Sequence, residues 1–239
     1  MSSDSEIDIS FDFRSDTPPG RDPDQWSATL RRYHRFLWSK PLPSGAMLEL
    51  SATTRGQYLG HSSELGDFIL ASDSVIPSFR RWKTLKWIIE QVPDADLDAF
   101  QRLGYTIGGM MVFPGNRIDG TQTINGARGF LRKIADRFDL TLESIRRYYA
   151  QEESPLSSTL ARYADFFMLF GDFRGYVDYF LLQDLVTDDY RVVRFFMEFD
   201  NFATSSVPRT LSEYDEYRRR SLEFVDARNR RIAEWASAV

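Results

Sequence analysis

The sequence contains no cysteine and only two histidines, His34 and His61. The absence of cysteine excludes disulfides, thiolate zinc sites, iron–sulfur clusters and cysteine nucleophiles. Two histidines are too few for a histidine-built metal centre, so we expect no metal site of that kind. Most of the familiar catalytic templates therefore do not apply to this chain.

Long apolar runs are also missing. The longest candidates, around 166–170 and 177–182, are short and flanked by Asp and Arg, whereas a membrane-spanning helix needs about 20 apolar residues. The segment Met1–Asp16 is acidic and lacks the basic start and the apolar stretch of a signal peptide. We therefore expect a cytoplasmic protein with no membrane partner.

The chain does contain enough apolar material for a sizeable core. Of its 239 residues, 42% are hydrophobic and 15% are aromatic, and the burial of such side chains is the usual source of stability. The acidic residues number 35 and the basic residues 30, which gives a net charge of -5. A generic nucleic-acid coat protein would be basic, so we do not expect one here.

Strand signals are concentrated in the first half of the chain. They are alternating polar and apolar residues, short apolar stretches and turn pairs such as Asp119-Gly120. The paired glycines Gly108-Gly109 indicate a close approach of two backbone segments. The predicted strands are Ile7–Phe13, Met47–Leu50, Gln57–His61, Phe68–Ala71, Gly104–Phe113 and Thr121–Ile124.

Helix signals dominate the second half, where apolar residues recur at three- and four-residue spacing. The predicted helices are 25–38, capped by Asp24, then 77–92, 141–150, 155–170, 173–186 and a terminal helix from Ser212. Strands followed by helices predict an α+β fold, in which an antiparallel sheet packs against helices. We expect one domain over residues 1–239, with residues 1–24 as an acidic segment that contains one strand.

The most suggestive stretch for chemistry runs from position 116 to 137. It combines two turns rich in Gly and Asn with an excess of basic residues, and backbone N–H groups at such turns attract anions. We therefore predict a module that binds a phosphate-bearing ligand, either a nucleotide or a short nucleic acid. The predicted ligand-binding residues are Asn116, Arg117, Asn125, Arg128, Arg132 and Arg137. The alternative is a pair of ordinary turns beside a solvated basic helix.

A second hypothesis makes the protein a hydrolase or transferase that acts on such a ligand, with His61 as catalytic acid and base. His61 precedes two serines and a predicted turn, and a histidine titrates near neutral pH. No G-x-S-x-G motif accompanies it, so a histidine that merely bonds to a neighbour in the hairpin is the alternative. His34 lies on the apolar face of a predicted helix and is expected to be a packed core residue.

Carboxylates offer a further route, because Asp and Glu can hold Mg²⁺ without any histidine. Two groups lie close in the sequence, and each also fits ordinary roles as helix caps, helix ion pairs or loop residues. These groups are Asp136, Asp139 and Glu143, and Asp184, Asp188 and Asp189. A third hypothesis is a protein-interaction module whose acidic segments, 1–24 and 152–200, dock a basic partner. The sequence leaves the cofactor unknown and does not decide whether the protein is an enzyme.

Several strings of residues resemble those of a bacterial family of uncharacterised proteins, a domain of unknown function. They are DFRSDTPPGRDPD, LWSKPLPSG, INGARG, IADRFDLTLESIRRYY and FLLQDLV. The resemblance extends from about Phe11 to Ile232 and implies one family-wide domain. It carries no catalytic or binding residue over to this chain.

Overall fold

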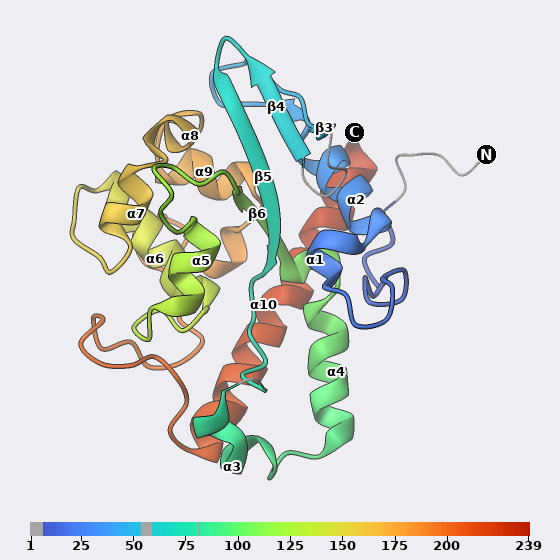
Figure 1. The fold of residues 1–239 in the computed structure, drawn as a ribbon, viewed down its shortest axis with the longest axis vertical. Helices are drawn as coiled ribbons and strands as arrows, with labels where there is room; N and C mark the ends of the chain where they lie inside the picture. The colour runs from blue at the N-terminus through green and yellow to red at the C-terminus, as the bar shows by residue number, and fades with distance from the viewer. Residues whose placement is uncertain (1–6, 54–58, 81) are drawn as a thin grey trace.

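A four-stranded antiparallel sheet forms the centre of the computed structural model, which describes residues 7–53, 59–80 and 82–239 (Figure 1). Its strands lie in the order β3-β4-β5-β6, and a separate ribbon pairs β1 with β2. The strands are β1 (Lys40–Pro41), β2 (Met47–Leu48), β3 (Ser51–Ala52), β4 (Leu59–Ser63), β5 (Gly66–Ser74) and β6 (Met110–Pro114).

The helices lie mostly in the second half of the chain, so the predicted α+β class is confirmed. The α-helices are α1 (Pro23–Trp26), α2 (Ala28–Trp38), α3 (Lys86–Ile89), α4 (Asp94–Gly104), α5 (Ile124–Phe130), α6 (Phe138–Tyr149), α7 (Ser157–Ala161), α8 (Ala164–Met168), α9 (Phe173–Tyr179) and α10 (Leu211–Ala238). Short 3₁₀ turns are η1 (Lys83–Leu85), η2 (Ile107–Gly109) and η3 (Gln183–Leu185).

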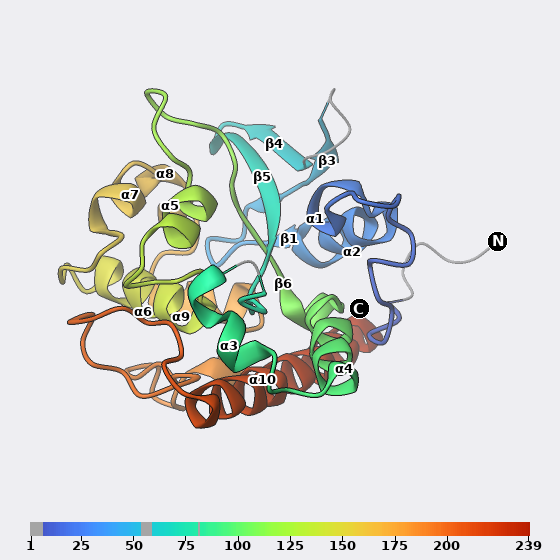
Figure 2. The ribbon, with the colours of Figure 1, turned by 60° about the horizontal axis from the view of Figure 1, so that its bottom comes forward.

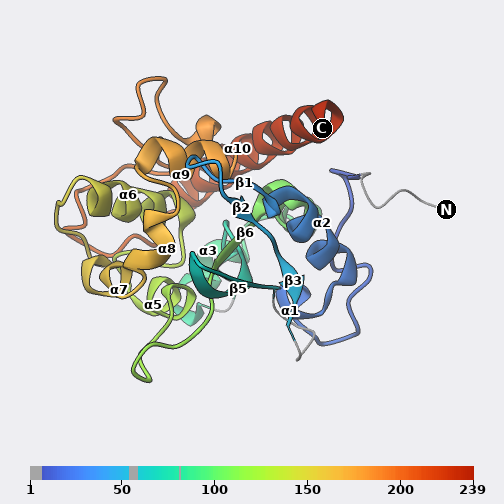
Figure 3. The same cartoon turned by 90° about the horizontal axis from the view of Figure 1, so that it is seen from above.

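The strands lie between two groups of helices. Seen from above, α5 to α9 gather on one side of the strands and α1 and α2 on the other (Figure 3). The long terminal helix α10 runs along the bottom of the molecule beside α3 and α4 (Figure 2). Buried hydrophobic side chains from both halves of the chain form one connected cluster. None of the described helices combines the length and the apolar character that a membrane crossing requires.

The β4–β5 hairpin follows the sequence prediction. Its two strands pair antiparallel, with His61 opposite Phe68 and Ser63 opposite Gly66. Gly66 has a φ of 122°, a conformation that glycine adopts without steric cost, and it closes the turn. Positions 57 and 58 of the predicted strand lie outside the described residues.

The close approach predicted at Gly108-Gly109 is also confirmed. A Cβ on Gly108 would lie 2.4 Å from the carbonyl oxygen of Val225, and one on Gly109 would lie 2.1 Å from that of Gly104. Any side chain at either position would collide with backbone, so α10 and the end of α4 can pack here only against glycine.

The N-terminal strand prediction was wrong. The described residues before α1 form turns and contain no strand. The side chain of Asp8 accepts hydrogen bonds from the backbone N–H and the hydroxyl of Ser10, and Asp12 accepts from the backbone N–H of Arg14 in the same way. These local bonds replace the bonds of a sheet, although Phe13 is still fully buried.

The sequence signals did not predict α4, and they predicted too long a helix before it. Asp94 and Asp96 lie in the first turn of α4, where their charge interacts favourably with the helix dipole. The helix predicted over 77–92 is reduced to η1 and α3. It starts late because Phe79 has a φ of 58°, which an α-helix does not allow.

The second predicted hairpin does not form. Asp119 and Gly120 do make a turn with positive φ, but Ile124 then begins α5 instead of ending a strand. The hydroxyl of Thr123 accepts a hydrogen bond from the N–H of Gly126 and caps the helix. Further on, the helix predicted over 155–170 is split into α7 and α8, and Gly171 lies between α8 and α9.

Candidate active site

A cavity of about 390 Å³ opens beside the end of β5. Four parts of the chain line it: α1, the segment from the end of β5 to Trp82, α4, and the loop between α5 and α6. Its volume suits a small molecule. What distinguishes its lining is acid, since the carboxylates of Asp22, Asp24, Asp73 and Asp136 all face it.

The floor of this cavity is held by Arg128, whose side chain is 0% exposed. Its Nη1 donates to Asp73 Oδ2 at 2.6 Å and forms an ion pair with Asp136 Oδ1 at 3.2 Å. The same guanidinium donates to the carbonyl oxygens of Ser74 and Asp136, and its Nε donates to the hydroxyl of Thr141. Two carboxylates are therefore fixed on one buried cation.

The two acidic partners of Arg128 reach the cavity although Arg128 does not. The side chain of Asp73 is 22% exposed and that of Asp136 is 34% exposed. The sheet fixes the position of Asp73, which lies opposite Met111 on β6. Arg128 thus binds the two carboxylates from the buried side, while Asp73 and Asp136 remain accessible to a ligand in the cavity.

A strained loop places Asp136. Ala135 and Asp136 both have positive φ, at 52° and 62°, a conformation that side chains other than glycine adopt at a cost. The backbone N–H of Asp136 donates to the carbonyl oxygen of Arg128, which locks the loop onto α5. Phe79, on another wall of the cavity, is also left-handed. Six other described non-glycine residues also have positive φ, so this conformation positions the loop but does not by itself mark a functional site.

Asp24 is supplied by α1, a single turn with Pro23 at its first position. The side chain of Asp22 caps this turn by accepting from the N–H of Asp24. Asp24 lines the cavity, and its Oδ1 is buried without a hydrogen-bond partner among the residues that the structure describes. A buried acceptor that receives no hydrogen is costly.

Burial shifts the titration of all three inner carboxylates upward. It raises the pKa of Asp73 to about 7, an effect that Arg128 opposes and Asp136 reinforces. Burial and the nearby charge of Asp73 raise the pKa of Asp24 well above its usual range. The pKa of Asp136 is also raised by burial, against the pull of Arg128. The set therefore retains a proton near neutral pH.

Of the residues predicted from the sequence, Arg128 lies at this site, and Asn125 lies on the same helix but is not in the cavity lining. Asn125 Nδ2 donates to the carbonyl oxygen of Ser72, the residue before Asp73, and Asn125 Oδ1 is buried without a partner in the described part of the chain. Arg128, however, is buried and bound to carboxylates, so it does not present its charge to an incoming anion.

The other predicted residues lie elsewhere. Arg137 is buried in an ion pair with Asp139 and donates to the carbonyl oxygen of Ser206. Asn116 is half-buried and accepts from the hydroxyl of Tyr163 through its carbonyl oxygen. The side chains of Arg117 and Arg132 are exposed on two different loops. The six residues thus do not surround one place.

His61 is not brought to Arg128. Its partner across the hairpin, Phe68, lies five residues before Asp73, or about 16 Å along the strand at about 3.3 Å per residue. The ring is buried, with Nδ1 bonded to the carbonyl oxygen of Glu49 and Nε2 bonded to the hydroxyl of Ser63. It therefore matches the alternative of a hairpin histidine held by its neighbours.

His34 is a packed core residue, as the sequence indicated. Trp38 Nε1 donates to its Nδ1, so Nε2 carries the proton and donates to the hydroxyl of Ser72. Burial, with the charge of Arg228 acting in the same direction, lowers the pKa of His34 to about 3. The ring is therefore neutral at physiological pH.

No three described His, Cys, Asp or Glu side chains are arranged to hold a metal ion. In the first carboxylate group considered from the sequence, Asp136 contacts Arg128, and Asp139 contacts Arg137. Glu143 is bound by two arginines of its own helix, Arg146 and Arg147.

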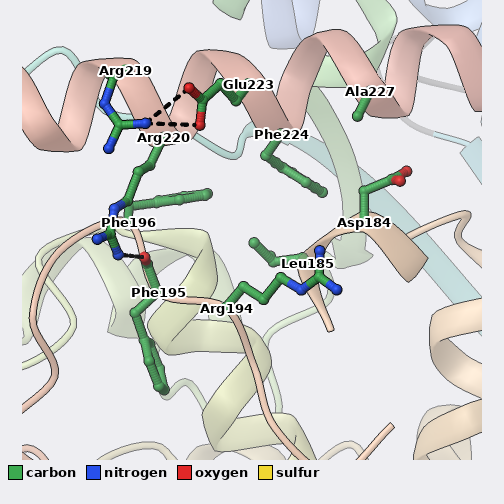
Figure 4. A pocket seen from close by; sticks show the side chains of 10 residues that line it. All are labelled: Asp184, Leu185, Arg194, Phe195, Phe196, Arg219, Arg220, Glu223, Phe224 and Ala227. Carbon is green, nitrogen blue, oxygen red and sulfur yellow. Dashed lines mark hydrogen bonds and ion pairs between the residues drawn. The ribbon is translucent and has the colours of Figure 1, made fainter. Parts of the chain in front are cut away.

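A larger cavity, of about 640 Å³, lies between α10 and the segment around η3 (Figure 4). Half of its lining residues are apolar, and most of the charged ones already have partners. Arg219 donates to Glu223, and Arg220 donates to the carbonyl oxygen of Phe195. It has no set of converging catalytic groups, so the smaller acidic cavity is the better candidate despite its size.

Comparison with known proteins gives one result. The chain matches, over residues 7–232, a family described as a family of unknown function (DUF6994). The chain belongs to this family. No curated protein and no solved structure matches it. DUF6994 therefore has no assigned activity that could be carried over, and the site must be interpreted from its own chemistry.

Proposed function

We propose that this DUF6994 chain is a hydrolase of small polar molecules, with Asp73 and Asp136 as its acid–base pair. The observation that carries the proposal is the arrangement around Arg128. Two carboxylates bind the same guanidinium nitrogen of a fully buried arginine and both line one cavity.

This arrangement supports proton transfer because one cation cannot balance all the carboxylates around it. When two acidic groups share one site, one of them keeps its proton near neutral pH while the other is ionised. The ionised group can take a proton from an attacking water molecule, and the protonated group can give one to the leaving group. Arg128 keeps both groups in place and stabilises the charge on whichever one is ionised.

The surroundings support a small substrate and access of water. Asp136 keeps a third of its side-chain surface exposed, so solvent reaches the pair. Trp82 lines the cavity and is half-buried, so it offers an apolar surface to a ligand. The segment before it is held by α10, where the hydroxyls of Tyr214 and Tyr217 donate to the carbonyl oxygens of Ser78 and Pro77.

The phosphate-bearing ligand predicted from the sequence stays a prediction. So does the docking of a basic partner by the acidic segments. The carboxylate pair takes precedence because its groups converge on one cavity, whereas the six predicted anion-binding residues are dispersed.

Hydrolysis of chromogenic esters, glycosides and phosphates between pH 6 and pH 8 tests the proposal, with Asp73→Asn and Asp136→Asn as variants. General acid–base catalysis contributes about 10²- to 10⁴-fold, so each variant should lose about that factor. Asp98→Asn, an exposed carboxylate on α4 that pairs with Arg80, is the matched control and should keep its activity. Turnover that survives in both Asp73→Asn and Asp136→Asn, or no hydrolysis of any of these substrate classes, would count against it.

A further inference from the structure

The larger cavity, between α10 and the segment around η3, differs from the acidic cavity in the sign of its charge (Figure 4). Its volume of about 640 Å³ lies within the range of small-molecule sites. The charged residues of its lining are three arginines and two carboxylates, Arg194, Arg219, Arg220, Asp184 and Glu223. Positive charge is therefore in excess here.

Arg194 is the source of this excess, because its guanidinium has no hydrogen bond or ion pair with any described residue. Its backbone is fixed, since its N–H donates to the carbonyl oxygen of Leu185 at 2.8 Å. Its side chain is exposed, and Figure 4 shows it directed toward Leu185. The nearby carboxylate of Asp184 is bound through both oxygens by Arg231, at 2.8 and 2.9 Å. A fixed segment thus presents an uncompensated cation to the cavity.

The other two arginines of the lining are held by exposed ion pairs of α10. Arg219 donates to Glu223, and Arg220 pairs with Glu216. The four side chains are between 39% and 62% exposed, and ion pairs of this kind contribute at most about 1 kcal/mol. An anion in the cavity can therefore replace these carboxylates at little cost.

The accessible surface of the cavity is mainly polar. Although half of the lining residues are apolar, Leu185, Phe196 and Phe224 are each at most 4% exposed. They offer a ligand little apolar surface to bury. The lining therefore favours a polar anion over a fatty acid or another anion with a large apolar body.

We infer that this cavity binds the phosphate group of a small molecule, with Arg194 as the main donor and Arg219 and Arg220 as further donors. A planar guanidinium can donate two parallel hydrogen bonds to phosphate oxygens, and such charge-assisted bonds are about twice as strong as neutral ones. The cavity shares no lining residue with the acidic cavity. This site is thus separate from the acid–base pair and does not depend on the proposed function.

Pyrophosphate is the probe, and sodium chloride at the same ionic strength controls for general screening. Pyrophosphate should raise the Tm of the whole chain and give a measurable Kd in calorimetry, beyond any effect of the chloride. Arg194→Gln should weaken pyrophosphate binding about tenfold or more, the effect of losing a charge-assisted hydrogen bond. Arg191→Gln removes an exposed cation outside the cavity lining and should bind as the unmodified chain does.

Glu223→Gln gives a change of the opposite sign. It removes a carboxylate from the lining and frees Arg219, so it should tighten pyrophosphate binding severalfold. Three outcomes would overturn the inference: equal effects of pyrophosphate and sodium chloride, unchanged binding by Arg194→Gln, or weaker binding by Glu223→Gln. None of these measurements involves turnover, so their failure would leave the proposed function of Asp73 and Asp136 unaffected.

Discussion

Arg128 and Arg228 are both fully buried, but they are compensated in different ways. Arg228, on α10, donates to the carbonyl oxygens of Gly108, Met110 and Phe180, and burial lowers its pKa to about 9. Arg128 is bound by two carboxylates that open onto a cavity. A ring of carbonyl oxygens cannot change its charge, whereas carboxylates can take up and release protons.

This difference indicates a structural role for Arg228 and a chemical role for Arg128. Arg228 connects three parts of the chain that lie far apart in the sequence, η2, β6 and the end of α9, and Asn229 beside it accepts from the N–H of Gly108. All of the residues in this contact are buried. Arg128 also connects distant elements, but the partners it holds remain accessible.

The largest effect is expected from Arg228→Met. The substitution leaves three buried carbonyl oxygens without their donor, and since each such group costs about 1–3 kcal/mol, the total loss should be about 3 kcal/mol or more. Urea unfolding should show this loss at both pH 5 and pH 8. The control is Arg230→Met on the same helix, where an exposed pair with Asp226 is broken and the change should stay within about 0.5 kcal/mol.

Arg128→Met should cost less, about 1–3 kcal/mol, because its acidic partners can be hydrated or protonated. The loss should be smaller at pH 5 than at pH 8, since protonation removes the repulsion between Asp73 and Asp136 once the cation is gone. The same urea titrations measure it. A loss equal to that of Arg228→Met and independent of pH would erase the distinction between the two arginines.

The pH dependence of stability provides a sharper comparison. The pKa of Asp73 is raised to about 7 in the folded chain, against about 3.9 for an unfolded aspartate. Between about pH 3.9 and pH 7, Asp73 is protonated in the folded state and ionised in the unfolded state. Asp73 therefore stabilises the folded chain fully below about pH 4, and this contribution is lost as the pH rises through about 7. The slope is at most about 1.4 kcal/mol per pH unit.

Asp73→Asn should remove this part of the slope. The comparison of the two proteins in urea at pH 5, 6, 7 and 8 isolates it from His34, which acts in the opposite direction because its pKa is lowered to about 3. Identical slopes for Asp73→Asn and the unmodified chain would mean that Asp73 titrates as an ordinary exposed carboxylate.

The smallest effect is a gain. Asp24→Asn replaces a buried carboxylate oxygen that lacks a partner in the described part of the chain by a neutral amide, and we expect it to stabilise the chain by about 1 kcal/mol. Differential scanning calorimetry measures this effect. A destabilised variant would show that the Asp24 carboxylate supports the fold.

Local signals in the sequence were enough to predict much of the fold. The β4–β5 hairpin and the close approach at Gly108-Gly109 follow from turn chemistry and from the size of glycine, and both are confirmed. The strand at Ile7–Phe13 was wrong because its alternating pattern competes with local bonds of Asp8 and Asp12. Periodicity does not reveal that competition.

The site could be predicted only in part. Arg128 and Asn125 stand out in the sequence, but the residues that give Arg128 its role, Asp24, Asp73 and Asp136, come from three elements far apart along the chain. Only the packing of α1 and of the α5–α6 loop against β5 brings them together. One local signal was present, because Asp73 directly follows the mostly apolar run FILAS near the end of a strand.

The direct test of the acid–base pair is a titration of its carboxyl groups by NMR, with ¹³C-labelled aspartate and with Asp73→Asn and Asp136→Asn for assignment. The account predicts that a proton leaves the pair between about pH 6 and pH 8, while the exposed Asp189 titrates at an ordinary or lower pH. If both Asp73 and Asp136 lose their protons below about pH 5, Arg128 stabilises two permanently ionised groups, and the acid–base account is contradicted.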